Sequence, residues 1–178
     1  MYNEGLRLHR VVQVATGFGH TLILTAVGVA LSYGNGKEGQ LGHGDRQSQS
    51  AARILTKFKG LPIIGVAAGL HHSCCIAESG SRTRIFTFGR NDRGQLGVQK
   101  SAGELPRSSS PLLIPCSFEG LTEMTPVQVA AGNYHTGVVT ETGALYCWGD
   151  NKHGQLGIGS SPSLTSRAKQ PANRPGAP

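Results

Sequence analysis

The tetrapeptide Gly-Gln-Leu-Gly occurs three times in this chain of 178 residues, at 39–42, 94–97 and 154–157. Each occurrence closes a longer unit. The unit runs from a hydrophobic segment through Gly-x-x-His, a second hydrophobic segment and a glycine to a third segment that ends in an aromatic residue and glycine. Such a repeat constrains the fold more than any single residue does, because each copy is a supersecondary unit that stacks on its neighbours.

The spacing inside the unit is nearly constant. The aromatic-Gly glycine precedes the first glycine of Gly-Gln-Leu-Gly by 5 residues in all three copies. The first glycine of Gly-x-x-His precedes aromatic-Gly by 17 residues in the first and third copies and by 20 in the second. The extra residues of the middle copy fall at Ser81–Arg84, which we interpret as a hairpin turn because insertions there cost little free energy.

Each copy predicts at least three short antiparallel strands. In the third copy, apolar and polar residues alternate over 127–131, which is the period of a half-buried strand. Further strands are expected at 135–140 and 144–148, and the variable segments 51–59 and 111–118 are expected to supply a fourth strand to their copies. Four-stranded sheets repeated along a chain are the blades of a β-propeller, so the predicted fold class is all-β.

The repeats predict one domain over residues 1–160, with units at about 11–60, 61–125 and 126–160. Charged residues make up only 15% of the chain and glycine accounts for 26 of its 178 residues, which favours an all-β protein with many tight turns. Residues 161–178 are rich in Pro and Ser and nearly devoid of large apolar side chains, so we expect a disordered tail.

Several polar residues recur once per unit and invite a chemical interpretation. Because each copy of such a residue would lie in a different blade, we expect architectural roles: hydrogen bonding at a strand start for histidine, satisfaction of turn backbone for glutamine, and anchoring to the core for leucine. The second residue after aromatic-Gly is Gly36, Asn91 or Asn151, and these residue types tolerate a left-handed backbone. The recurrent positions are His20, His72, His135, Gln40, Gln95, Gln155, Leu41, Leu96 and Leu156.

The unit G-x-x-H, strand, x-x-G, strand, W/F/Y-G-x-N/G-x-x-G-Q-L-G resembles the RCC1 repeat, named for the regulator of chromosome condensation. The match covers residues 11–98 and 126–160. The resemblance implies a propeller of about seven blades that serves as an interaction platform. In this family the founding member catalyses guanine-nucleotide exchange on the small GTPase Ran and binds chromatin, and many relatives are scaffolds. Three units predict an incomplete propeller, with self-association to complete a ring as one alternative.

No nucleophile with a base, carboxylate pair or phosphate-cradling loop is evident, so the sequence predicts neither a conventional enzyme nor a metal or other cofactor. The four cysteines lack C-x-x-C spacing and are expected to be reduced, which favours an intracellular protein, cytoplasmic or nuclear. No apolar run is long enough to span a membrane. The favoured function is a protein-interaction scaffold, and the alternatives are a nucleotide-exchange factor for a small GTPase and a chromatin- or nucleic-acid-binding module.

Partner-binding loops are expected around the middle copy. A net charge of +7 suits an acidic partner, and four arginines close in sequence could form one basic patch. An exchange factor needs a projecting wedge, for which Ser81–Arg84 and the long segment 98–111 are the candidates. The candidate contact residues are Arg82, Arg84, Arg90, Arg93, Lys100, Glu104 and Arg107.

Overall fold

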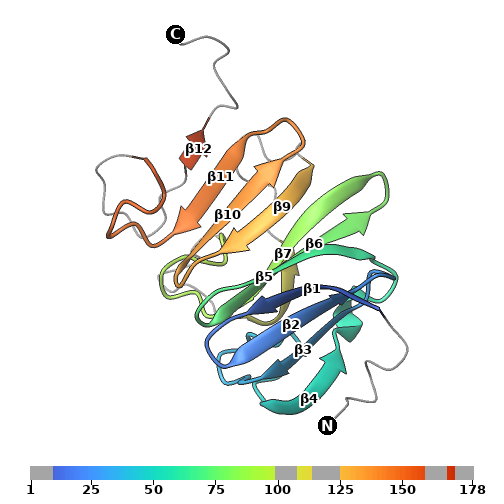
Figure 1. The fold of residues 1–178 in the computed structure, drawn as a ribbon. Helices are drawn as coiled ribbons and strands as arrows, with labels where there is room; N and C mark the ends of the chain where they lie inside the picture. Colours follow the sequence, from blue (N-terminus) through green and yellow to red (C-terminus); the bar gives the residue numbers. More distant parts are fainter. Residues whose placement is uncertain (1–9, 99–107, 114–124, 159–167, 171–178) are drawn as a thin grey trace.

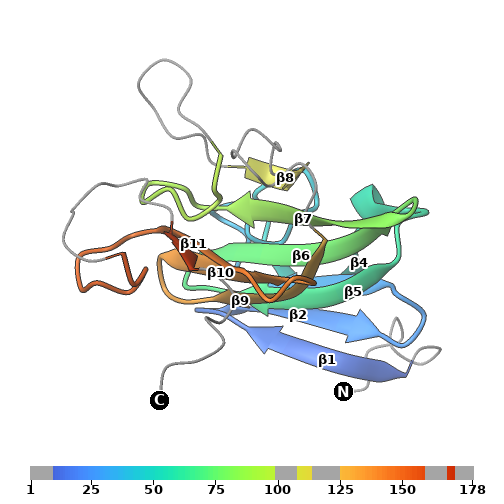
Figure 2. The same ribbon diagram turned by 90° about the horizontal axis from the view of Figure 1, so that it is seen from above.

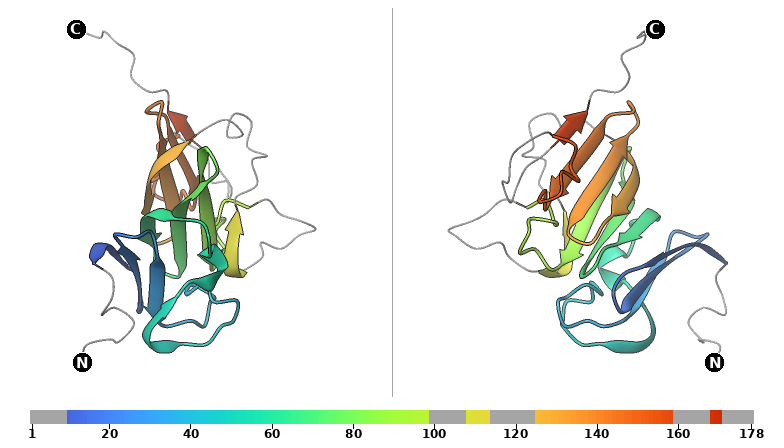
Figure 3. Two further views of the ribbon diagram at one scale, coloured as in Figure 1. Left: turned by 90° about the vertical axis from the view of Figure 1, so that its right-hand side faces the viewer. Right: turned by 60° about the vertical axis from the view of Figure 1, so that its left-hand side comes forward.

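The computed structural model describes residues 10–98, 108–113, 125–158 and 168–170. Within them the chain forms three four-stranded antiparallel sheets, which we call blades 1, 2 and 3. Figure 1 shows blade 1 in blue, blade 2 mainly in green and blade 3 in orange, lying one after another. The same order is visible from two other directions in Figures 2 and 3. The predicted all-β propeller-blade fold is confirmed.

The strand bounds follow the repeat. Blade 1 comprises β1 (Val11–Thr16), β2 (His20–Thr25), β3 (Ala30–Gly34) and β4 (Gln49–Ile54). Blade 2 comprises β5 (Ile63–Ala68), β6 (His72–Ser79), β7 (Arg82–Gly89) and β8 (Ser108–Leu113). Blade 3 comprises β9 (Pro126–Ala131), β10 (His135–Thr140), β11 (Leu145–Gly149) and β12 (Ala168–Gln170). A short 3-10 helix, η2 (Thr56–Phe58), lies between blades 1 and 2.

The strand register explains why two motif residues recur together. The Gly-x-x-His histidine pairs with the aromatic-Gly glycine in every blade, as His20 with Gly34, His72 with Gly89 and His135 with Gly149. At Gly34 the φ angle is +103°, and a Cβ atom there would collide with the Gly19 carbonyl oxygen. Only glycine accepts both the left-handed backbone and this close approach, so the motif fixes where each hairpin ends.

Two apolar clusters lie between the blades and hold the stack together. The first joins blades 1 and 2 and includes Leu22, Leu24, Val66, Cys75, Phe58 and Phe88. The second joins blades 2 and 3 and includes Val138, Tyr146 and Trp148, with Ile85 packed against it. Strands β1 and β5 are in contact, as are β5 and β9, so the first strands of consecutive blades adjoin. Each blade therefore buries one face against the next, as expected for radial repetition.

The middle hairpin differs from the prediction. Ser81–Arg84 is not an inserted loop, because Ser79 pairs directly with Arg82 and only Gly80 and Ser81 form the turn. The three extra residues, together with two gained from a shorter turn, lengthen β6 and β7 to 8 residues each, against 6 and 5 for β2 and β3. Adding residue pairs to both strands keeps the alternation of side chains, so a longer hairpin costs no change of register.

The fourth strands begin earlier than expected. β4 starts at Gln49 and β8 at Ser108, ahead of the predicted segments 51–59 and 111–118. A further difference is β12, which pairs with β11 although residues 161–178 were expected to be disordered. Pairing at a sheet edge uses backbone groups, so a polar Ala-Lys-Gln sequence suffices. Within the described residues no helix is long and apolar enough to cross a membrane.

Candidate interaction surface

A hydrogen-bonded chain ties blade 1 to blade 2. The Nε2 atom of His20 lies 3.0 Å from the hydroxyl of Ser73, and that hydroxyl donates to the main-chain carbonyl of Gln40 at 2.7 Å. Because the hydroxyl proton is committed to the carbonyl, the imidazole must be the donor in the first bond. His20 therefore carries its proton on Nε2, and its Nδ1 atom is buried without a hydrogen-bond partner.

The junction between blades 2 and 3 repeats this arrangement. His72 Nε2 lies 2.9 Å from the hydroxyl of Thr136, which donates to the carbonyl of Gln95 at 2.8 Å. The indole Nε1 of Trp148 donates to the same carbonyl at 2.9 Å. We call each set of histidine, hydroxyl and glutamine carbonyl a junction relay. The two relays have equivalent members. In each, a histidine and a glutamine of one blade hydrogen-bond to a hydroxyl of the following blade.

Burial keeps the relay histidines neutral. Loss of hydration lowers the pKa of His20 to about 4 and that of His72 to about 3. His135 of blade 3 is only half-buried, and its side chain makes no hydrogen bond within the described part of the chain. Burial lowers its pKa as well, against the opposing effect of the Asp150 carboxylate. The three equivalent histidines thus occupy two closed relays and one open position.

The glutamine side chains close the turns that contain them. The side-chain oxygens of Gln40, Gln95 and Gln155 each accept a main-chain N–H from two residues earlier, at 2.9, 2.9 and 2.8 Å. Leu41, Leu96 and Leu156 are buried. These contacts hold the Gly-Gln-Leu-Gly turn in one conformation, so that its main-chain carbonyl can meet the hydroxyl of the next blade.

The second residue after aromatic-Gly has a different structural role from the predicted one. The side chains of Asn91 and Asn151 accept the main-chain N–H groups of Leu96 and Leu156, at 2.9 and 3.0 Å. Gly36 does not have a left-handed backbone; a Cβ atom there would collide with the carbonyl of Gln47. Close approach of the backbone, and not a positive φ, therefore explains this glycine.

The two residues inside each Gly-x-x-His loop differ between copies and form a continuous surface, which we call the loop face. Its members are Phe18, Leu70, His71, Asn133 and Tyr134. Phe18 N donates to the Leu70 carbonyl and Leu70 N to the Asn133 carbonyl, both at 3.2 Å. The Phe18 ring is 64% exposed and meets His71 edge to face, with 5.6 Å between ring centroids. A repeated backbone frame thus presents different side chains side by side.

One ion pair lies at the edge of the loop face. Arg90 N donates to the His71 carbonyl, which places the arginine at the edge of this surface. Its guanidinium makes two hydrogen bonds of 2.8 Å to the Asp92 carboxylate. This contact raises the pKa of Arg90. Burial alone would raise the pKa of Asp92, but hydrogen bonds from Arg90 and Gln95, together with the charge of Arg90, lower it. The surface is therefore aromatic and polar at its centre, with the Arg90–Asp92 ion pair and the largely buried Asp150 carboxylate at its margin.

The structure separates the arginines that were expected to form one basic patch. Arg82 and Arg84 lie on β7 next to the hairpin turn, whereas Arg90 and Arg93 follow the other end of the same strand. An extended strand rises about 3.3 Å per residue, so the two pairs are more than about 20 Å apart. The four arginines therefore do not adjoin in one patch along the strand, and their role as partner contacts stays a prediction. Lys100, Glu104 and Arg107 lie outside the described residues.

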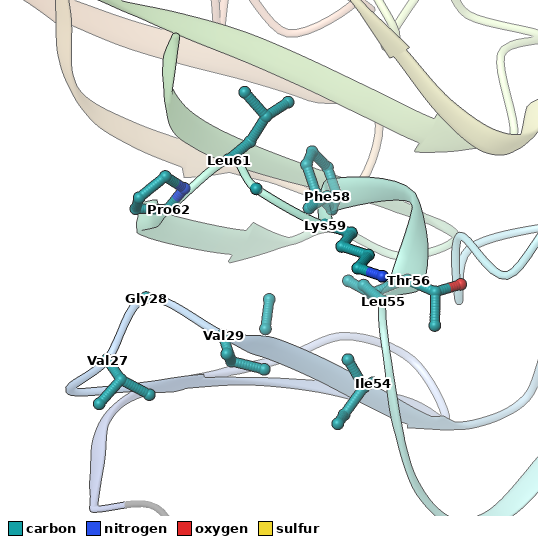
Figure 4. Close-up of a pocket in the computed structure, with 12 residues that line it drawn as sticks. Val27, Gly28, Val29, Ile54, Leu55, Thr56, Phe58, Lys59, Leu61 and Pro62 are labelled. Atoms are coloured by element: carbon teal, nitrogen blue, oxygen red, sulfur yellow. The ribbon is translucent and has the colours of Figure 1, made fainter. Parts of the chain in front are cut away.

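A concave feature lies where blades 1 and 2 meet, at the end of β2 opposite to the loop face. Figure 4 shows this apolar cleft of about 440 Å³ between the β2–β3 turn and the segment that contains η2. Its walls include Val27, Val29, Ile54, Phe58, Leu61 and Pro62. Sequence reasoning missed both the cleft and the loop face. The signal for the loop face was present, since these residue pairs vary inside a constant motif.

Comparison with known proteins decides the family. A model described as the regulator of chromosome condensation (RCC1) repeat matches residues 28–76, 84–139 and 142–174, which together are well over half of the chain. The chain belongs to the RCC1 repeat family. A second RCC1 repeat model matches residues 63–95 and 127–155. The predicted resemblance is therefore confirmed, and the blades described above are RCC1 blades.

Individual RCC1 relatives extend well beyond this chain. RCC1 domain-containing protein 1 of Homo sapiens is 33% identical over 185 residues, covering 87% of this chain and 48% of the relative. The chain thus spans about half the length of that relative. Human WBSCR16 matches with a TM-score of 0.72 and 26% identity, covering 90% of this chain and 39% of that chain. Prp20p from Saccharomyces cerevisiae, whose report describes binding to Gsp1p and histones, matches with a TM-score of 0.63 and 25% identity, covering 82% and 32%.

Proposed function

We propose that this RCC1 chain is a protein-interaction module and that the loop face is its binding surface. One observation carries the proposal: the junction relays and the His–Gly register repeat in every blade or junction, while the side chains that the loops present do not repeat. Residues free to vary on a rigid frame are suited to recognition, because the frame removes the ordering cost that flexible loops would add on binding.

The chemistry of the loop face favours a partner that presents an apolar side chain bordered by hydrogen-bonding groups. Phe18 offers an exposed aromatic ring already held against His71, and Tyr134 adds a second half-buried aromatic side chain. Aromatic residues that combine a large contact area with little conformational freedom dominate the energetics of protein interfaces. We therefore expect Phe18 and Tyr134 to contribute most to binding.

Phe18 and Val27 provide a matched test. Both belong to blade 1 and are 64% and 63% exposed, but they lie beyond opposite ends of β2. Quantitative affinity capture from cells should compare the unmodified chain with Phe18→Asp and Val27→Asp. The proposal expects a set of partners whose recovery falls with Phe18→Asp and persists with Val27→Asp. Equal recovery with both variants, or a loss confined to Val27→Asp, would exclude the loop face.

Guanine-nucleotide exchange on a small GTPase is a second proposal, supported by the likeness to Prp20p and its described binding to Gsp1p. Of the two wedge candidates, Ser81–Arg84 is a tight turn followed by strand, and most of 98–111 lies outside the described residues. The test is release of a fluorescent nucleotide from a panel of small GTPases. Release no faster than the intrinsic rate across the panel would reject exchange while leaving the scaffold proposal intact.

Chromatin contact and an intracellular location are finer proposals of the same kind. The net charge of +7 and the described binding of Prp20p to histones support the first. The free, buried thiols of Cys74 and Cys75 support the second. Binding to nucleosomes should weaken steeply with added salt if phosphate contacts carry it, and a salt-independent signal would argue against them.

A further inference from the structure

The two junctions define a head and a tail for every blade. The tail presents the relay histidine, the glutamine carbonyl and the last glycine of Gly-Gln-Leu-Gly. The head presents the relay hydroxyl and the aromatic ring that precedes glycine. In both junctions that ring rests on the glycine: a Cβ atom at Gly42 would come within 2.7 Å of Phe88, and one at Gly97 within 2.8 Å of Trp148. Head and tail are therefore complementary surfaces, and each pair of neighbouring blades uses them in the same way.

Blade 1 adds a further contact to its tail. The side chain of Gln13 accepts the Val66 N–H at 3.1 Å and donates to the Val66 carbonyl at 3.0 Å. It thereby clamps the first strand of blade 2 from the first strand of blade 1. The equivalent residue of blade 2 is Gly65, which cannot make this clamp, and that of blade 3 is Gln128.

The tail of blade 3 has all of these elements and no neighbour within the described part of the chain. Gln128 and Gly157 are exposed, and the half-buried imidazole of His135 has no hydrogen bond to described residues. Blade 1 holds the matching head. Thr21 occupies the place of the relay hydroxyls Ser73 and Thr136, and Tyr33 that of Phe88 and Trp148.

The exposed fraction of Val14 shows what changes when no described blade precedes its strand. It is the counterpart of Val66, the residue that Gln13 clamps in the junction between blades 1 and 2. Val66 is 2% exposed, whereas Val14 is 55% exposed. Ile23 and Leu31, further out on the head of blade 1, are already buried. The accessible part of the head is therefore its inner portion, where Val14 is exposed and Thr21 and Tyr33 are half-buried.

We propose that the tail of blade 3 binds the head of blade 1 of a second copy of this chain. His135 Nε2 donates to the Thr21 hydroxyl, and that hydroxyl donates to the Gln155 carbonyl. Tyr33 rests on Gly157, and Gln128 clamps the backbone at Val14. A second copy is the expected partner because blade 1 of the same sequence carries a counterpart for each of these four contacts, as in the two existing junctions. A heterologous contact of this kind closes into a ring or continues from copy to copy.

The first test is the mass of the chain in solution, measured by light scattering or sedimentation over a range of concentrations. The proposal expects a concentration-dependent dimer or larger species. Val14→Asp in the head and Gln128→Asp in the tail should each weaken association by about tenfold or more, because a junction would bury an unpaired charge. Both residues are exposed in one copy, so the unfolding temperature at low concentration should not change. Val27→Asp, an equally exposed substitution away from both faces, is the control.

Mixing the two variants gives the decisive result. The Val14→Asp chain keeps an intact tail and the Gln128→Asp chain keeps an intact head, so an equimolar mixture should form one-to-one dimers with the affinity of the unmodified chain. A symmetric contact of like surfaces would give no such recovery. A monomer at all concentrations, association insensitive to both substitutions, or no recovery on mixing would each overturn the proposal.

Discussion

The closed junction between blades 2 and 3 and the open tail of blade 3 contain the same motif residues in different surroundings. His72 is fully buried, holds the Thr136 hydroxyl and is neutral. His135 occupies the same place in its own strand, pairs with the equivalent glycine, and is only half-buried. The comparison shows that the hairpin of blade 3 forms without a closed relay. Its contribution to stability is expected to arise where a following blade supplies the hydroxyl.

Acidification should lower the free energy of unfolding more than any substitution does. It acts by charging the histidines of the two closed relays. An unfolded histidine has a pKa of 6.5, whereas the folded values are about 4 for His20 and about 3 for His72. Below pH 6.5 the unfolded chain binds protons that the folded chain does not, so stability falls with pH until the folded values are reached. The loss should be on the order of 3 kcal/mol for His20 and on the order of 5 kcal/mol for His72 once the folded pKa values are reached. Urea unfolding at a series of pH values measures this. A free energy of unfolding that is flat between pH 6.5 and 4 would contradict the neutral relays.

Replacing single histidines separates the closed from the open position. His72→Ala should reduce the free energy of unfolding by about 3 kcal/mol, because it leaves a cavity and deprives the Thr136 hydroxyl of a donor. His135→Ala should cost less than about 1 kcal/mol, since the side chain is half-buried and has no hydrogen bond to described residues. Urea unfolding of both variants at neutral pH and low protein concentration makes the comparison. Equal losses would show that the histidine stabilises its own blade and not the junction.

The indole of Trp148 distinguishes the two closed junctions from each other. Its Nε1–H donates to the Gln95 carbonyl, a bond that Phe88 cannot make in the first junction. Trp148→Phe should therefore cost about 1–2 kcal/mol, by loss of a buried hydrogen bond and some packing. Thermal and urea unfolding measure the loss. A variant as stable as the unmodified chain would show that the relay alone satisfies the carbonyl.

The Gln13 clamp should give the smallest effect. Gln13→Ala removes two partly buried hydrogen bonds to Val66 and should cost about 1 kcal/mol. Gln128→Ala, at the equivalent position of the open tail, should change the stability of the monomer by less than about 0.5 kcal/mol. Urea unfolding at low concentration provides the comparison. A larger loss for Gln128 than for Gln13 would reverse the assignment of open and closed ends.

The sequence predicts the blades well because the repeat itself encodes them. Spacing between glycines fixes the hairpins, and the glycine at aromatic-Gly has no substitute where the φ angle is +103°. The relay partners could have been predicted too, since Thr21, Ser73 and Thr136 each follow a motif histidine. A hydroxyl recurring beside each histidine was the available signal. Only the stacking of blades reveals that the partner belongs to the following copy.

Other features depend on geometry that residue types do not specify. The separation of Arg84 from Arg90 follows from the length of β7, which a loop interpretation of Ser81–Arg84 concealed. The cleft arises where the turn at Gly28 meets Pro62, two segments that only the packing of blades 1 and 2 brings together. Short motifs predict local backbone, whereas the positions of surfaces depend on element lengths and on the angle between blades.

The protonation of the three motif histidines tests the difference between closed and open positions most directly. Nitrogen-resolved NMR of the imidazoles reports both the tautomer and the pKa of each ring. His20 and His72 should carry their proton on Nε2 and stay neutral down to pH values near 4 and 3, while His135 should titrate at a higher pH than either. A proton on Nδ1 of His72, or a His72 that becomes charged at a higher pH than His135, would contradict the junction relays.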